Sequence, residues 1–321
     1  MSKNVPVKHI NNERKIERWV TINGNHVPIF EGETEEDVKH RLDNWNKQNS
    51  KKASYADLLR EHDIYEATAQ FVADNHIAIS EGVLNEIDPE VLVEVYDTID
   101  DIKDKYKCWL KNIKLMDRKD ENGNEETAMA DISIDGTMRL NPEYFESGWY
   151  LNDIFKDCVD DKFHPPAPNG TIGVISHELG HALVYEKLFS RQKELLRGGT
   201  DWGMDGDIVA INRWLGNPSN FPELETSGGK QIFKEWYEAI NKIQENVANN
   251  KTIQEKWGGK PNMNITAMAK RLPRPYGVSG YAETNYHELI AESFSDVFCN
   301  GDQASLISKE VYKVICKEME K

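Results

Sequence analysis

One stretch of the sequence decides the fold and points to the chemistry, Thr171-Ile-Gly-Val-Ile-Ser-His-Glu-Leu-Gly-His-Ala-Leu-Val-Tyr-Glu-Lys-Leu188. Its apolar positions follow a helical period, and it contains the pattern His-Glu-x-x-His. Residues four apart in a helix are rotated by about 40° and raised by about 6 Å. The imidazoles of His177 and His181 therefore project from the same face of the helix and can bind one tetrahedral ion. Glu178 stands beside them and is free to take a proton from an attacking water. The stretch therefore predicts a metal-binding helix that also carries a general base.

The third ligand of this predicted site has to come from elsewhere, because a catalytic zinc ion takes three protein ligands and leaves one position for water. A Gly and a His three and six residues after the second His would continue the motif locally, but Val184 and Lys187 stand there. Downstream, the apolar pattern of residues 280–298 predicts a packed helix, with Glu288 and Glu292 on one face beside the apolar stripe. Buried carboxylates are costly without a counterion, which favours a cation partner for this helix.

The two segments together resemble a known metallopeptidase family. His-Glu-Leu-Gly-His, followed about a hundred residues later by Tyr-x6-Glu-x2-Ala-Glu-x-Phe, is similar to the gluzincin arrangement of the anthrax lethal factor catalytic domain and the Pro-Pro endopeptidases. The resemblance implies that Glu288 is the third zinc ligand and that Glu292 lies outside the ligand set, where it orients a zinc-bound group. It also implies that Tyr281 donates its hydroxyl to the oxyanion. The resemblance covers about residues 130 to 300.

The residues alone leave alternatives open at several of these positions. His287 lies about 100° around the helix from Glu288 and is a weaker choice for the third ligand. Further options are Glu283 or Asp296 as the ligand, and Tyr276 or Tyr286 as the oxyanion donor. His164 precedes Pro165-Pro166 and is expected to be a surface loop residue.

The order of the predicted elements indicates an α+β fold, because strands precede a mainly helical C-terminal half. Asn23-Gly24 and Asp135-Gly136 each separate two alternating apolar runs, which is typical of hairpins. Asp88-Pro89-Glu90 is a good helix start, and residues 110–115 predict a strand. The resemblance implies a zincin-like domain with a small mixed sheet, in which Thr137-Met-Arg-Leu140 is an antiparallel edge strand that binds substrate by strand addition. An ordinary hairpin is the alternative there.

We expect two regions along the chain. Residues 1–50 form an N-terminal hairpin and charged tether, and residues 51–321 form the metallopeptidase domain, with a helical lead-in at 51–108 and a catalytic core at about 109–300. The segment from Trp19 to Ile29 is similar to short segments of minor head proteins of phages and prophages of Gram-positive bacteria. This similarity raises a phage virion partner as an option.

Composition excludes several classes of protein. The 321 residues carry 39 Lys and Arg against 55 Asp and Glu, a net charge of −16, which argues against a general binder of nucleic acid or of anionic membranes. No segment approaches the roughly 20 apolar residues that span a bilayer, and residues 1–12 show no secretory signal. Synthesis in the cytoplasm is expected, with virion association or non-Sec export as options. Four widely spaced cysteines predict free thiols.

The sequence thus predicts a zinc-dependent metallopeptidase that hydrolyses a peptide or protein substrate. One zinc ion per chain is expected, with His177, His181 and Glu288 as ligands and Glu178 as general base. The alternative is a structural or assembly protein of a phage or prophage that retains a zincin-like domain with little or no general protease activity.

Overall fold

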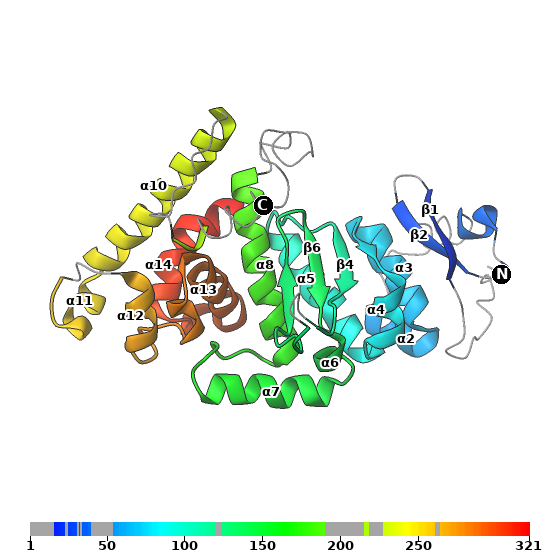
Figure 1. Ribbon diagram of the computed structural model, residues 1–321, viewed down its shortest axis with the longest axis horizontal. Helices are drawn as coiled ribbons and strands as arrows, with labels where there is room; N and C mark the ends of the chain where they lie inside the picture. The colour runs from blue at the N-terminus through cyan, green and yellow to red at the C-terminus, as the bar shows by residue number, and fades with distance from the viewer. Residues whose placement is uncertain are drawn as a thin grey trace. The chain divides into compact units, whose positions relative to one another are not determined.

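The structure is a computed structural model of an α+β protein, mostly helical with one small four-stranded sheet, as the sequence predicts (Figure 1). It describes residues 16–22, 25–30, 32, 34–39, 54–119, 123–189, 215–217, 227–260 and 264–321. Contacts divide the chain into unit 1, with residues 1–100, 111–131 and 137–148, and unit 2, with residues 101–110, 132–136 and 149–321. The boundary expected near residue 50 lies outside the described residues.

Unit 1 begins with the predicted N-terminal hairpin. Strands β1 (Ile16–Ile22) and β2 (Asn25–Phe30) pair antiparallel, with Ile22 opposite Asn25. This register confirms a connection of two residues, as the Asn-Gly pair predicts. The turn residues Asn23 and Gly24 themselves lie outside the described part of the chain.

The helices of unit 1 include α2 (Tyr55–Glu61), α3 (Ile64–Asn75), α4 (Glu81–Glu86), α5 (Pro89–Lys105), which continues beyond the unit, and α6 (Pro142–Phe145). Helix α5 begins where expected, because the carboxylate of Asp88 accepts a hydrogen bond from the backbone N–H of Glu90 at 2.8 Å and Pro89 occupies the first turn. One face of this helix is apolar and buried, with Val91, Val95, Ile99 and Ile102.

The sheet contains β3 (Ala78–Ile79), β4 (Asn112–Leu115), β5 (Ala130–Ile132) and β6 (Thr137–Leu140) in the order β3-β4-β6-β5. Strand β4 pairs parallel with both β3 and β6. The turn before β6 needs a left-handed residue, which Gly136 supplies with φ 86°, and its N–H donates to the Ser133 carbonyl at 2.9 Å.

The expected edge position of Thr137–Leu140 is wrong. This strand is β6, which lies between β4 and β5 and is hydrogen-bonded on both sides. A strand paired on both sides has no free backbone edge, so it cannot bind a peptide by strand addition. The local pattern predicts the strand and its turn, but it does not show that residues 112–115 pair alongside it from a distant part of the sequence.

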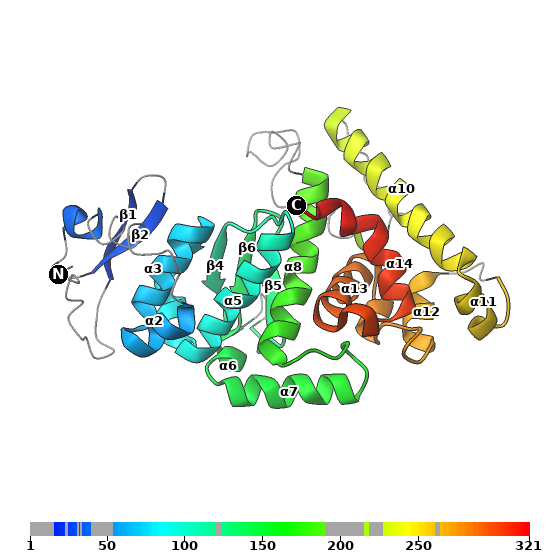
Figure 2. The same ribbon diagram turned by 180° about the vertical axis from the view of Figure 1, so that it is seen from behind.

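Unit 2 is helical, with its elements listed here in chain order: α7 (Gly148–Asp160, whose first residue belongs to unit 1), α8 (Gly170–Phe189), α10 (Ser227–Asn249), α11 (Lys251–Trp257), α12 (Ile265–Arg271), η1 (Tyr281–Glu283), α13 (Tyr286–Asn300), η2 (Gly301–Gln303), α14 (Leu306–Ile315) and η3 (Lys317–Met319). Helices α8 and α13 lie side by side, and α14 packs against α13 (Figures 1 and 2). None of the described helices combines the length and apolar character needed to cross a membrane.

Close packing joins α8 to α13. Helix α8 is buried along most of its length, as expected of a helix that is apolar on nearly every side. A Cβ atom on Gly180 would lie 2.7 Å from the Cα atom of Ala291, so only glycine allows the two backbones to approach this closely. The first turn of α13 is held by Asn285, whose side chain accepts a hydrogen bond from the N–H of Glu288 at 3.0 Å. The backbone of Glu288 is therefore fixed in the first turn of α13.

We predict that Gly180→Ala destabilises the protein by about 1–3 kcal/mol, because the added methyl group meets backbone that no side-chain rotation can move. The matched control is Gly82→Ala in α4, where the nearest atom is the flexible Cδ1 end of Leu115 at 2.9 Å. Urea unfolding of both variants measures the difference. Equal stability of the two variants would show that the helices are not held at this contact.

Candidate metal centre

Helix α8 presents its two histidines to one point, as the i, i+4 spacing predicts. The Nε2 atoms of His177 and His181 lie 3.2 Å apart, and both residues are 7% exposed. Both imidazoles therefore turn the same ring nitrogen toward a shared position inside the protein.

The carboxylate of Glu288, from α13, completes a triangle of ligand atoms. Its Oε2 atom lies 3.2 Å from the Nε2 atom of His177 and 3.3 Å from that of His181. In a tetrahedral zinc site with bonds of about 2.0 Å, neighbouring ligand atoms are about 3.3 Å apart. The three measured edges match this spacing, so the group has the geometry to bind one metal ion.

The Oε2 atom of Glu288 also lacks another partner. It is buried and forms no hydrogen bond within the described part of the chain, since its contacts with the two Nε2 atoms are at ion-pair distance without hydrogen-bond angles. A buried carboxylate oxygen in this state is costly, and a cation at the centre of the triangle would satisfy it. Two imidazoles and one carboxylate are a known donor set for catalytic zinc, so the residues present fit this ion.

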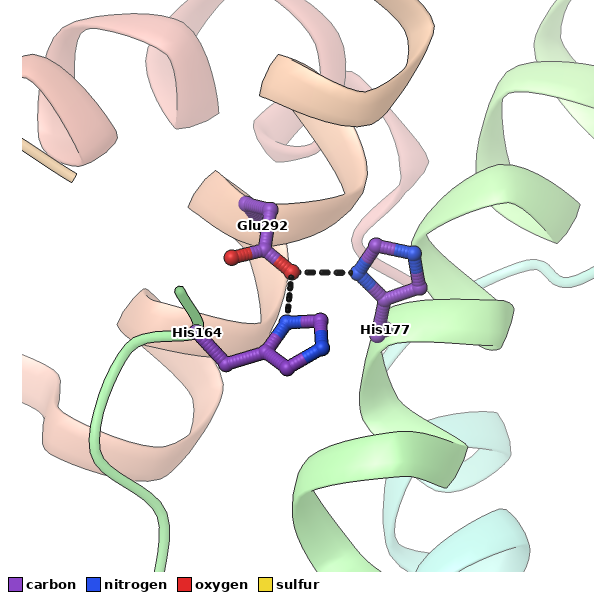
Figure 3. A group of neighbouring side chains, drawn as sticks. All are labelled: His164, His177 and Glu292. Carbon is purple, nitrogen blue, oxygen red and sulfur yellow. Dashed lines mark hydrogen bonds and ion pairs between the residues drawn. The ribbon is translucent and has the colours of Figure 1, made fainter. Parts of the chain in front are cut away.

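A second group of side chains adjoins the triangle, formed by His164, His177 and Glu292 (Figure 3). The Oε1 atom of Glu292 lies 2.8 Å from the Nδ1 atom of His164 and 2.7 Å from that of His177. The contact with His164 is a hydrogen bond and the contact with His177 is an ion pair, and both are too short for two ligands of one tetrahedral ion. Glu292 therefore contacts the outer ring nitrogen of a ligand, and the inner nitrogen remains available to a metal.

The charged groups around His177 favour its protonated form when no metal is bound. Burial lowers the pKa of His177, but its contacts with Glu288 and Glu292 outweigh burial and raise the pKa well above the ordinary value. Burial raises the pKa of Glu288, but the adjacent His181 and His177 lower it strongly overall. Burial likewise raises the pKa of Glu292, but His164 and His177 lower it to about 2. Two ionised carboxylates thus face the imidazoles at neutral pH.

Glu178 and Tyr281 lie around this group. Glu178 is 6% exposed and follows His177 directly on α8. The Tyr281 ring, on η1, has its centroid 5.7 Å from that of His177. Burial, followed by the charges of Glu288 and Glu178, raises the pKa of Tyr281, so its hydroxyl keeps its proton at neutral pH and can donate a hydrogen bond.

The alternative residues from the sequence have other partners. Glu283 forms an ion pair with Lys270, and the carboxylate of Asp296 accepts from Arg274 at 2.8 Å and from Ser305 N at 2.9 Å. The hydroxyl of Tyr286 is bonded to Gln244 at 2.6 Å, and the ammonium group of Lys256 lies over the Tyr276 ring. His287 is buried with its ring centroid 4.1 Å from that of His181, outside both ligand groups.

Two residues near the triangle are not indicated by the sequence motifs, His164 and Ser279. His164 is not a surface loop residue, because its side chain is only 16% exposed and bonds to Glu292. Ser279 donates its hydroxyl to the other oxygen of Glu292 at 2.6 Å. No local pattern signals either residue, because each becomes important only through a carboxylate that is remote along the chain.

Comparison of the chain with protein-family models, with curated proteins and with solved structures gives no match. The likeness to gluzincin metallopeptidases therefore rests on the motif residues themselves.

We predict that metal binding at pH 7 releases a proton from His177. Because the pKa of His177 is raised in the folded protein, the metal-free site holds this proton at neutral pH and loses it only as the pH rises through the raised value. Zinc affinity should therefore increase with pH, by about tenfold per unit for one displaced proton. Calorimetric titration in buffers of different ionisation enthalpy measures the release. Binding heats that are identical in all buffers would contradict the prediction.

Proposed function

We propose that this chain is a zinc-dependent metallopeptidase of the gluzincin type. The observation that carries the proposal is the triangle of His177 Nε2, His181 Nε2 and Glu288 Oε2, with edges of 3.2, 3.2 and 3.3 Å. The triangle brings together two helices whose ligand residues are about a hundred positions apart in the sequence. Three protein ligands leave one position of a tetrahedral ion open, which is the arrangement of catalytic zinc sites.

The proposed reaction is hydrolysis of a peptide bond. Zinc, when bound by this triangle, supplies Lewis-acid chemistry, which acidifies water and polarises a carbonyl group. Glu178 accepts the proton of the attacking water and delivers it to the leaving amine, the role of a general base that becomes a general acid. Its place next to His177 on α8 supports this role.

Two further residues have supporting roles in the proposal. Tyr281 donates its hydroxyl to the oxyanion that forms at the scissile carbonyl, and its raised pKa keeps the donor protonated. Glu292 holds the outer nitrogen of His177 at 2.7 Å, so the ligand keeps a fixed ring orientation. Both roles agree with those implied by the resemblance to gluzincins.

A second candidate function is a structural or assembly role in a phage or prophage particle. The N-terminal hairpin of β1 and β2 is the observation in its favour, because its sequence is the part similar to minor head proteins. In this case the protein would bind zinc and a virion protein and would cleave no peptide of a general pool.

Purified protein should contain about one zinc ion per chain, as expected for one site with three protein ligands. We predict that Glu288→Ala loses this zinc, because two imidazoles alone leave two positions without protein ligands. Glu283→Ala is the matched control, since Glu283 is a nearby glutamate paired with Lys270. Elemental analysis by mass spectrometry gives the content. A Glu288→Ala variant that retains full zinc would reject Glu288 as a ligand.

We predict that Glu178→Gln keeps the zinc and lowers the rate of peptide cleavage by about 10²- to 10⁴-fold, the contribution typical of a general base. Glu186→Gln on the same helix is the control and should cleave at the wild-type rate. Cleavage is followed on a proteome-derived peptide pool. Full activity of Glu178→Gln would exclude the role of Glu178. Zinc binding without cleavage by the wild-type protein would favour the assembly function.

A further inference from the structure

The carboxylate of Glu292 is one of the most enclosed charged groups in the described chain, with 0% exposure. Three side chains surround it. Its Oε2 atom accepts from Ser279 at 2.6 Å, and its Oε1 atom lies 2.8 Å from His164 Nδ1 and 2.7 Å from His177 Nδ1. Because a carboxylate oxygen accepts and does not donate, the Nδ1 atom of His164 carries the hydrogen of its bond to Glu292, and His177 Nδ1 meets the same oxygen as an ion pair. His164 and His177 are thus joined through one oxygen atom.

The backbone that carries His164 is tied to the segment that carries Tyr281. This stretch follows α7, and the carbonyl of Lys162 accepts from Gly280 N at 2.7 Å, while the carbonyl of Phe163 accepts from Tyr281 N at 3.0 Å. These two backbone hydrogen bonds hold the residues just before His164 against the segment that carries Tyr281.

Two aromatic rings also contact the His164 ring. It stacks on Phe155 with a centroid distance of 5.7 Å and an interplanar angle of 10°, and it meets the Tyr281 ring edge to face at 5.4 Å. Side-chain exposure of 16% leaves it little freedom. Backbone hydrogen bonds, ring stacking and a buried carboxylate therefore hold the His164 side chain in one position.

We propose that His164 is a positioning residue of the metal centre, which orients Glu292 so that the carboxylate holds His177 with its Nε2 atom facing the ion. This inference rests on the proposed zinc site and adds a residue that the gluzincin motif does not contain. His164 does not bind the ion itself, because its distance of 2.8 Å to Glu292 is that of a hydrogen bond and is shorter than the spacing of ligand atoms around zinc, about 3.3 Å.

The physical consequence is a loss of metal affinity when the donor is removed. Without His164, one partner of Glu292 Oε1 is missing, and the buried carboxylate can turn away from His177 toward water that enters the vacated space. The ligand then loses its fixed orientation. Removal of a partner that orients a metal ligand typically weakens binding by about 10- to 100-fold.

Two variants of similar polarity test the donor. His164→Asn places an amide nitrogen near the position of Nδ1 and keeps a hydrogen bond to Glu292, whereas His164→Gln places its amide near the position of Nε2 and does not. His62→Gln, on the exposed end of α2, is the matched control. Zinc affinity is measured by competition with a chelator, and thermal unfolding of the metal-free forms checks that each variant folds.

The expected result is about 10- to 100-fold weaker zinc binding by His164→Gln, with His164→Asn and His62→Gln close to wild type. Equal affinity of His164→Gln and wild type would overturn the inference, even if the unfolding temperature changed. Equal weakening by Asn and Gln would also overturn it, because the hydrogen bond would then not be responsible. Loss of zinc as complete as in Glu288→Ala would make His164 a ligand and would overturn it too. Absence of zinc from wild-type protein would instead reject the proposed function.

Discussion

The close packing of α8 against α13 at Gly180 and Ala291 is the constraint on which the site depends. A Cβ atom at position 180 would lie 2.7 Å from the Cα atom of Ala291, so the two backbones approach as closely as glycine permits. This approach allows a short carboxylate side chain on α13 to reach both imidazoles on α8 within 3.3 Å. The ligand atoms are therefore placed by two rigid, buried helices, which hold a site more accurately than loops do.

Charge balance is the second condition that the site has to meet. Glu288 and Glu292 bring two carboxylates into the interior, and burial without compensation would be costly for each. The contact distances indicate that the two carboxylates are compensated in different ways. Glu292 is hydrogen-bonded to Ser279 at 2.6 Å and to His164 at 2.8 Å and lies 2.7 Å from His177 Nδ1, whereas Glu288 keeps the wider spacing that suits a shared cation.

Local sequence patterns predicted the parts of the molecule that depend on near neighbours. The spacing of His177 and His181 predicted their common face, and Asp88-Pro89 predicted the start of α5. Patterns failed where pairing is remote along the chain. The position of β6 inside the sheet depends on β4, and the role of His164 depends on a carboxylate 128 positions away. Neither partner can be recognised from the residues beside them. The local sequence of His164 predicts a surface loop, and the edge position of residues 137–140 is implied only by the resemblance to gluzincins.

The proposed zinc site consists of His177, His181 and Glu288, which would bind one ion together. Anomalous diffraction at the zinc absorption edge, from crystals of the protein purified with its native metal, tests it most directly. We predict one strong peak at about 2.0–2.2 Å from His177 Nε2, His181 Nε2 and a Glu288 carboxylate oxygen. A peak between His164 and Glu292, or no peak in unit 2, would contradict it.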